Sequence, residues 1–250
     1  MVQTELLAKE LDDALLARRE IAPLVQTHGD FDLDAAYRIQ ERGIAMRLSR
    51  GEKIVGYKMG LTSAAKRAQM NLGQPIYGVL TDAMRVEGTL RVADGVHPKI
   101  EPEIAFVTRR QLVGRISREQ AFAALEGVAA ALEVLDSRFT GFKYFSLPDV
   151  VADNCSSWRF VLGPVRKPRD TGGLAMRMRV DGRVVQETDS NAISGHPLES
   201  LVQLVELLPH PLPAGSIVLA GAATVAEALR PGMEISLEVR DLGSVSVRTA

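Results

Sequence analysis

The sequence predicts an α+β fold in which a helical N-terminal extension precedes a β-rich body. Up to about residue 50, apolar residues recur at the three- and four-residue spacing of helices. Beyond it, short apolar runs bounded by glycine, proline or aspartate predominate, as expected of strands. Because no repeat, low-complexity tract or linker interrupts the chain, we expect residues 1–52 to form the extension and residues 53–250 the β-rich domain, together one structural unit.

Composition narrows the class of protein. The chain of 250 residues can bury a full core, and its 30 Lys and Arg residues balance 31 Asp and Glu residues. No basic field therefore favours nucleic acid or an anionic membrane. Cys155 is the single cysteine, which excludes an intramolecular disulfide and a thiolate metal cluster. The chain opens without a signal-like segment, and no apolar run approaches the ~20 residues that cross a bilayer, so we expect a cytoplasmic protein.

Two amphipathic helices are expected in the extension. Residues 4–19 place leucines on one face among charged residues, and Pro23 follows as a stop signal. Residues 33–50 repeat the pattern, with Asp32 placed to cap the helix N-terminus. Neither segment carries residues that suggest chemistry. We expect these helices to pack on the main body or on another subunit.

Strands open the body, and we expect them over residues 53–61, 74–80, 88–92 and 100–107. After the first strand, Thr62 and Ser63 cap a short helix over residues 64–70. Lys58 lies inside the first strand. A lysine in a half-buried strand commonly extends to solvent. The alternative is a lysine near a substrate, beside a helix N-terminus that holds a carboxylate. The residues alone favour the first interpretation.

The second half of the body alternates helices and strands. An almost wholly apolar run over residues 118–132 predicts a buried helix, and the alternation after it predicts a strand over residues 133–139. The turn at Asp181 and Gly182 predicts a hairpin over residues 174–186. The remaining elements are helices over residues 147–154 and 196–207 and strands over residues 156–162, 216–220, 234–240 and 244–248.

Two carboxylates on the strand over residues 100–107 suggest a metal site. Glu101 and Glu103 are spaced two apart, so they project to the same face of a largely apolar strand. There they repel each other and are costly to dehydrate unless a cation lies between them. Such a pair is usually a solvated strand face, and two glutamates are too few for a complete Mg²⁺ or Mn²⁺ site. Glu133, which opens the predicted strand after the buried helix, is a credible third donor.

Motifs spread along the chain resemble one known family. They lie at residues 56–63, 75–78, 99–106, 131–138 and 152–154. In this order they are similar to the hydratase/decarboxylase family of aromatic meta-cleavage pathways, which belongs to the fumarylacetoacetate hydrolase superfamily. The resemblance runs from about residue 6 to the end of the chain, including residues 241–245.

The resemblance implies a fold, a metal and a set of roles. The fold would be a fumarylacetoacetase-like mixed β-roll, with residues 53–250 as the catalytic domain. Glu101, Glu103 and Glu133 would hold Mg²⁺ or Mn²⁺, and Lys58 would reach the substrate. For Glu101 and Glu103, mutual repulsion and the cost of dehydration indicate a cation without the resemblance. The role of Lys58 follows from the resemblance alone.

Two reactions divide the family: hydration of 2-hydroxypenta-2,4-dienoate and decarboxylation of 2-oxo-3-hexenedioate. The resemblance places an aspartate of the hydratases where this chain has Ile76. Hydration needs a group that moves protons and orients water, which isoleucine does not offer. An apolar residue suits decarboxylation, where it dehydrates the departing carboxylate. We therefore expect a decarboxylase. The alternatives are a hydratase, or a non-catalytic partner that stabilises a sister hydratase.

Further residues are candidates for binding the substrate. Thr62 and Ser63 would hold its C1 carboxylate at a helix N-terminus. The weaker candidates are Asn154 and Ser157 for lining the pocket and Arg138 or Lys143 for the distal carboxylate. For each of these a structural role is at least as plausible, and Arg138 could pair with Asp136 or a neighbouring strand.

The remaining expectations concern histidines, the cysteine and assembly. His97 and His196 each precede a proline at an element boundary, where a histidine more often caps a helix or bonds the backbone than binds metal. Cys155 is expected to be a small buried thiol rather than a nucleophile. A homo-oligomer is expected from the helical extension and from the small-residue helix predicted over residues 118–132. The resemblance also implies a complex with the dienoate hydratase of the same pathway.

Overall fold

The computed structural model describes residues 2–62, 75–142 and 146–250. The helix expected over residues 64–70 lies outside this part of the chain. The α-helices are α1 (Val2–Ala17), α2 (Leu24–His28), α3 (Leu33–Ser49), α5 (Arg118–Ala123), α6 (Leu147–Ala152) and α7 (Pro197–Leu207). The strands are β1 (Ile54–Gly60), β2 (Ile76–Thr81), β3 (Thr89–Leu90), β4 (Lys99–Thr108), β5 (Leu125–Leu135), β6 (Ser157–Leu162), β7 (Ala175–Val180), β8 (Arg183–Asp189), β9 (Ile217–Leu219), β10 (Glu227–Ala228), β11 (Glu234–Val239) and β12 (Gly243–Thr249).

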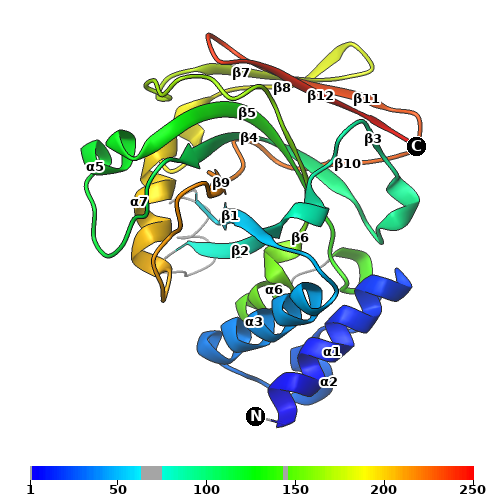
Figure 1. The fold of residues 1–250 in the computed structure, drawn as a ribbon. Coiled ribbons are helices and arrows are strands. Elements are labelled where there is room, and N and C mark those ends of the chain that lie inside the picture. The colour runs from blue at the N-terminus through cyan, green and yellow to red at the C-terminus, as the bar shows by residue number, and fades with distance from the viewer. Residues whose placement is uncertain (1, 63–74, 143–145) are drawn as a thin grey trace.

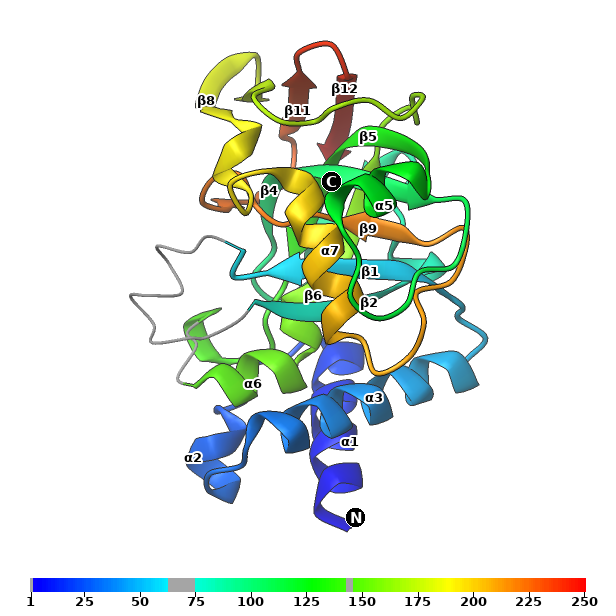
Figure 2. The same ribbon diagram turned by 90° about the vertical axis from the view of Figure 1, so that its left-hand side faces the viewer.

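Two sheets form the body of the molecule. The larger sheet has the strand order β2-β1-β9-β4-β5-β6, with β10 paired to β4, and it contains both parallel and antiparallel pairs. The smaller sheet has the order β3-β12-β11-β7-β8 and lies across the outside of β4 and β5 (Figure 1). Helices α1, α2, α3 and α6 gather at the opposite end of the larger sheet (Figure 2).

The helical extension forms much as its sequence indicates. Asp32 caps α3 by accepting a hydrogen bond from the backbone N–H of Ala35 at 2.7 Å. Helix α2 was not predicted, because its five residues are too few to show a period. Leu24 in α2 is nevertheless fully buried, in a cluster that also contains Leu7 and Ile39. The extension therefore packs on the body through this apolar cluster, which residues of both parts form.

The buried helix predicted over residues 118–132 is wrong. Helix α5 ends at Ala123, and the rest of this run is strand β5, which pairs with β4 on one side and β6 on the other. A central strand covered on both faces needs apolar residues at every position, so it lacks the alternation that marks a half-buried strand. Glu133 consequently lies near the end of a long strand rather than at the start of a short one.

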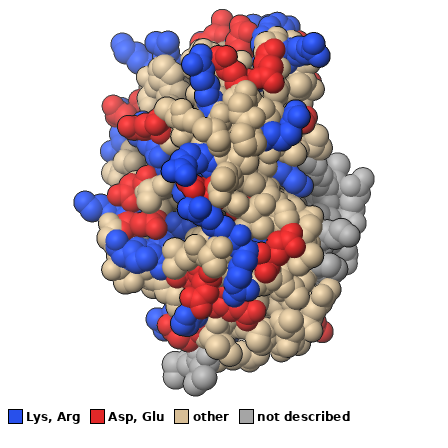
Figure 3. Space-filling view, turned by 90° about the vertical axis from the view of Figure 1, so that its right-hand side faces the viewer, with Lys and Arg blue, Asp and Glu red and all other residues tan. Residues whose placement is uncertain are grey.

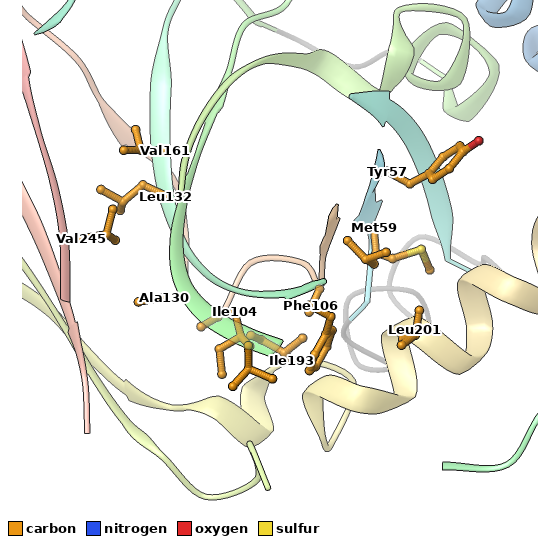
Figure 4. Packing of buried hydrophobic residues seen from close by; sticks show 14 of the residues in the cluster. Tyr57, Met59, Ile104, Phe106, Ala130, Leu132, Val161, Ile193, Leu201 and Val245 are labelled. Carbon is orange, nitrogen blue, oxygen red and sulfur yellow. The ribbon is translucent and has the colours of Figure 1, made fainter. Parts of the chain in front are cut away.

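The outer face of β4 and β5 is packed with apolar side chains. Figure 4 shows Leu132 of β5 and Val161 of β6 facing Val245 of β12, where the two sheets meet. On the same side of β4, Phe106 lies toward Leu201 of α7, and both side chains are fully buried. Because side chains alternate along a strand, residues 101, 103 and 105 of β4 face the other way. The inner face therefore carries Glu101 and Glu103 together with the small side chain of Ala105.

The larger sheet curls until its edges approach each other. The side chain of Asn154 accepts a hydrogen bond from the Val79 backbone N–H at 2.8 Å and donates one to the Val79 carbonyl at 2.9 Å. Gly78 permits this approach, because a Cβ there would lie 2.5 Å from the Ser157 hydroxyl oxygen. β2 thus meets the segment that leads into β6, which confirms the mixed β-roll with N-terminal helices.

The surface shows no separation of charge on the face seen in Figure 3, where lysine and arginine side chains lie among aspartates and glutamates. This agrees with the balanced composition of the chain. Among the described residues, no helix has both the length and the apolar content needed to cross a bilayer.

Candidate metal centre

Three glutamates meet on the inner face of the roll. Glu101 of β4 lies directly opposite Glu133 of β5 in the antiparallel register, and Glu103 follows two residues along β4. Carboxylate oxygens of all three lie within 4.8 Å of one another. Glu103 and Glu133 are fully buried, and Glu101 is 9% exposed. The fold thus brings together the donors that were expected from positions thirty residues apart in the sequence.

One internal cation partly offsets the negative charge. The Lys58 ammonium lies 3.0 and 3.2 Å from the two carboxylate oxygens of Glu133. Burial by itself lowers the pKa of Lys58, but Glu133 and the other nearby carboxylates outweigh it, so the pKa stands above its usual value. Burial raises the pKa of Glu103 well above its usual range, and Glu133 and Glu101 add to that rise. Negative charge therefore remains in excess around Glu103.

The orientation of Glu103 leaves one oxygen directed at the cluster. Its Oε2 accepts a hydrogen bond from the backbone N–H of Gly221 at 2.8 Å. Its Oε1 is buried and finds no hydrogen-bond donor among the described residues. Gly221 has φ +107°, a conformation that side-chain-bearing residues rarely adopt. No signal in the sequence pointed to this support, because one glycine after a strand resembles many others.

The donor set fits a hard divalent cation. Carboxylate oxygens are the ligands that Mg²⁺ and Mn²⁺ prefer. Oxygens that bind one Mg²⁺ ion, each ~2.1 Å from it, lie roughly 3 to 4.2 Å from one another. The carboxylate oxygens of the three glutamates lie within 4.8 Å of one another, which is close to that spacing. An ion here would satisfy the Oε1 of Glu103 and relieve the repulsion that raises its pKa. The residues present therefore fit a metal that would be held by Glu101, Glu103 and Glu133.

Ile76 lies on the same side of the β1–β2 pair as Lys58. Lys58 pairs with Gly78 and Gly60 with Ile76 in the antiparallel register, and alternation places all four on one face. Ile76 is 2% exposed and packs in the cluster that contains Cys155 and Leu61. The residue at position 76, on the face of the β1–β2 pair that also bears Lys58, is therefore packed among apolar side chains.

The predicted carboxylate-binding residues are only partly described. Thr62 is buried, its carbonyl accepts a hydrogen bond from Ser194, and its side chain lies beside Gly221, which supports Glu103. Thr62 is thereby close to the glutamate cluster. Ser63 and Lys143 lie outside the described residues.

The weaker candidates gather elsewhere. Arg138, Asn154 and Ser157 line a cavity of about 40 Å³ together with residues of α1 and α3, and none of the three glutamates lines it. The amide of Asn154 is committed to Val79. The Ser157 hydroxyl lies against Gly78 and finds no hydrogen-bond partner among the described residues. The structure therefore favours a structural role for Asn154.

Arg138 is also committed to the fold. Its guanidinium pairs with the carboxylate of Asp153 and donates a hydrogen bond to the Asp153 carbonyl at 2.8 Å, with both side chains buried. Burial raises the pKa of Asp153 to about 6, against the lowering effect of Arg138. The structure therefore favours a structural role for Arg138 over binding of the distal carboxylate, although its partner is Asp153 rather than Asp136.

Of the two histidines, His196 makes the expected cap, whereas the His97 side chain pairs with a carboxylate rather than with the backbone. The His196 side chain caps α7 by accepting a hydrogen bond from the Leu198 backbone N–H at 3.1 Å. His97 lies 2.5 Å from a carboxylate oxygen of Glu20. Cys155 is buried, as expected, and burial raises the pKa of its thiol to about 12.

These features define a β-roll protein with a buried cluster of three glutamates that could hold a metal, and comparison with known proteins places it in a family. The family model described as fumarylacetoacetate (FAA) hydrolase C-terminal matches residues 54–249, so the chain belongs to that family. The chain is 45% identical to a 4-oxalocrotonate decarboxylase of Pseudomonas sp., over 97% of this chain and 96% of that protein. It is 32% identical to a 2-hydroxyhexa-2,4-dienoate hydratase of Comamonas testosteroni, over 96% and 95%.

A solved structure shares the whole architecture. The 4-oxalocrotonate decarboxylase from Pseudomonas putida G7, complexed with magnesium and adipate, superposes with a TM-score of 0.95 at 37% identity. The match covers 99% of this chain and 97% of that one. A fumarylpyruvate hydrolase from Pseudomonas aeruginosa matches with a TM-score of 0.59 at 20% identity, which supports the fold alone.

Removing Arg138 should weaken the fold. Arg138→Met leaves Asp153 buried without its cation, and breaking a buried ion pair in this way costs roughly 3–5 kcal/mol. Urea denaturation should show that loss in the free energy of unfolding. Arg115→Met, which removes an exposed pair with Glu206, should cost less than about 1 kcal/mol. Equal losses in the two variants would contradict the structural role of Arg138.

Proposed function

We propose that this chain is a metal-dependent carboxy-lyase. It would decarboxylate 2-oxo-3-hexenedioate (4-oxalocrotonate) to 2-hydroxypenta-2,4-dienoate and CO₂ in the degradation of aromatic compounds. The observation that carries the proposal is the buried cluster of Glu101, Glu103 and Glu133 beside Lys58, with an apolar residue at position 76. The 45% identity to a decarboxylase along nearly the whole chain supports it.

The three glutamates would hold Mg²⁺ or Mn²⁺. When bound, such an ion supplies Lewis acidity to a chelating 2-oxo acid, drawing electron density toward the C2 oxygen. The P. putida G7 decarboxylase was solved with magnesium in one structure and calcium in another, which supports an oxygen-ligand site for a hard cation here.

Lys58 would stabilise the charge that grows on the substrate. An ammonium has three hydrogens, and contact with the Glu133 carboxylate does not use all of them. A remaining N–H can donate to the C2 oxygen as electrons move onto it during loss of CO₂. Glu133 would keep this ammonium charged and fixed in position. Thr62 and Ser63 would hold the C1 carboxylate.

Ile76 favours decarboxylation over hydration. It is packed against apolar neighbours on the Lys58 side of the sheet, where a hydratase needs a group that delivers protons and orients water. An apolar wall instead excludes water from a carbanion-like intermediate. Hydration of 2-hydroxypenta-2,4-dienoate is the second candidate function, because hydratases are also among the relatives.

The proposal extends to assembly and location. We propose a homo-oligomer and a cytoplasmic setting. A complex with the hydratase that consumes the dienol product would hand over a product that is unstable in solution. A non-catalytic role beside a hydratase would require that the glutamate cluster be dispensable.

Product analysis tests the reaction. Purified protein with Mg²⁺ and 2-oxo-3-hexenedioate should release CO₂ and form 2-hydroxypenta-2,4-dienoate, followed by CO₂ detection and ultraviolet absorbance. The same protein should hydrate the dienol slowly or not at all. Rapid formation of 4-hydroxy-2-oxopentanoate without CO₂ release would establish the hydratase instead.

Replacing one ligand should remove the response to metal. Glu103→Gln keeps the side-chain shape but deletes a buried charge, so the metal-free variant should be at least as stable as the natural protein. Mg²⁺ should bind at least ~100-fold more weakly and should no longer raise the melting temperature. Calorimetry and thermal melts measure both. Glu126→Gln, exposed on the same strand as Glu133, is the matched control and should bind Mg²⁺ normally. Unchanged Mg²⁺ binding in Glu103→Gln would exclude this site.

Removing Lys58 should make the fold depend more on the metal. Lys58→Met leaves the three carboxylates without their internal cation, so Mg²⁺ should raise the melting temperature more than it does in the natural protein. Turnover should fall roughly 10²- to 10³-fold, because a preorganised donor to the developing charge is lost. Full turnover together with an unchanged metal-dependent shift would contradict both roles.

A further inference from the structure

One face of β4 leads from the glutamate cluster to the protein surface. Residues 99, 101 and 103 share that face because side chains alternate along a strand. Exposure rises along it: Glu103 is fully buried, Glu101 is 9% exposed and Lys99 is half-buried. Lys99 is therefore the next side chain outward from the candidate metal centre.

The Lys99 ammonium is held by an aromatic ring. Its Nζ lies 4.1 Å from the centroid of the Phe142 ring. Within the described ranges, no carboxylate lies at ion-pair distance from it, in contrast to Lys58 with Glu133 and Arg138 with Asp153. A ring contact leaves the positive charge uncompensated and is weaker than an ion pair. Lys99 is thus a cation near the centre that an incoming anion can still engage.

The spacing along β4 is of the same order as the length of a six-carbon dicarboxylate. Lys99 lies two residues before Glu101, and two residues of strand span ~6.8 Å of backbone. An extended six-carbon chain spans roughly 6 Å between its end carbons, given C–C bonds of ~1.5 Å. A dioate bound at one end between the glutamates can consequently present its far carboxylate near Lys99.

We propose that Lys99, positioned by Phe142, binds the distal carboxylate and selects dicarboxylate over monocarboxylate 2-oxo acids. This inference rests on the proposed function. It assigns to Lys99 the role that was expected of Arg138 or Lys143, of which Arg138 is paired with Asp153.

The chemistry predicts which kinetic constant Lys99 controls. In the reaction the C5–C6 bond breaks, its electron pair passes through the conjugated carbons to the C2 oxygen, and C6 leaves as neutral CO₂. The C2 oxygen then takes a proton from water to give the 2-hydroxy product. The carboxylate therefore loses its charge as the transition state forms. An ammonium that binds it stabilises the ground state more than the transition state, so Lys99 contributes affinity and not rate.

Binding of two matched ligands tests the inference without turnover. Calorimetry in Mg²⁺ compares adipate with hexanoate, which has the same length but one carboxylate. The natural protein should prefer adipate by roughly 10-fold, the size expected of a half-exposed charge-assisted contact. Lys99→Met should abolish that preference and Lys99→Arg should keep most of it. Lys53→Met removes an exposed lysine at the start of the first strand and should leave the preference unchanged.

Steady-state kinetics add a second readout. Lys99→Met should raise the KM for 2-oxo-3-hexenedioate about 10-fold without lowering kcat. A preference for adipate that survives in Lys99→Met, or natural protein that does not distinguish the two ligands, overturns the inference. So does a large fall in kcat at unchanged KM. If the natural protein releases no CO₂ but its adipate preference depends on Lys99, the proposed reaction fails while the dicarboxylate subsite stands.

Discussion

An excess of buried negative charge is the constraint on which the rest of this structure depends. Glu101, Glu103 and Glu133 meet where water is scarce, and Lys58 neutralises only part of their charge. Carboxylates so placed must take up a proton or a cation. The buried Oε1 of Glu103, which finds no donor among the described residues, shows where that need is greatest. Binding a metal would relieve this excess charge, and protonation of Glu103 is the alternative in its absence.

The roll meets this constraint by using the two faces of β4 and β5 differently. The outer face packs apolar side chains against the second sheet and α7, which anchors both strands. The inner face places small side chains, Ala105, Ala129 and Ala131, beside the glutamates. A rigid outer layer thus holds charged groups that repel one another. The antiparallel register then decides which carboxylates meet.

Under the proposed function, residues around the centre would distinguish related reactions. Decarboxylases and hydratases are both relatives of this chain. Ile76 is packed among apolar side chains on the same face of the β1–β2 pair as Lys58, where it would disfavour the addition of water. Lys99 lies one same-face position further out along β4, where in our proposal it binds the far carboxylate of a dioate. Reaction type and substrate class would then be set by two residues that bind no metal.

The family, the mixed β-roll and the pairing of Glu101 with Glu103 on one face could be predicted from the sequence, and the comparisons and structure confirm the family and fold. Local signals also predicted the Asp32 cap and the turn at Asp181 and Gly182, because each depends on neighbouring residues. The division of the chain into a helical extension over residues 1–52 and a catalytic domain over residues 53–250 stays a prediction. Tertiary structure alone decided that residues 125–135 form a strand, that Lys58 pairs with Glu133 and that Arg138 pairs with Asp153. A strand buried on both faces shows no alternation of apolar and polar residues. The partner of a buried charge depends on strand register and on how the chain crosses between strands, and neither is visible in the local sequence.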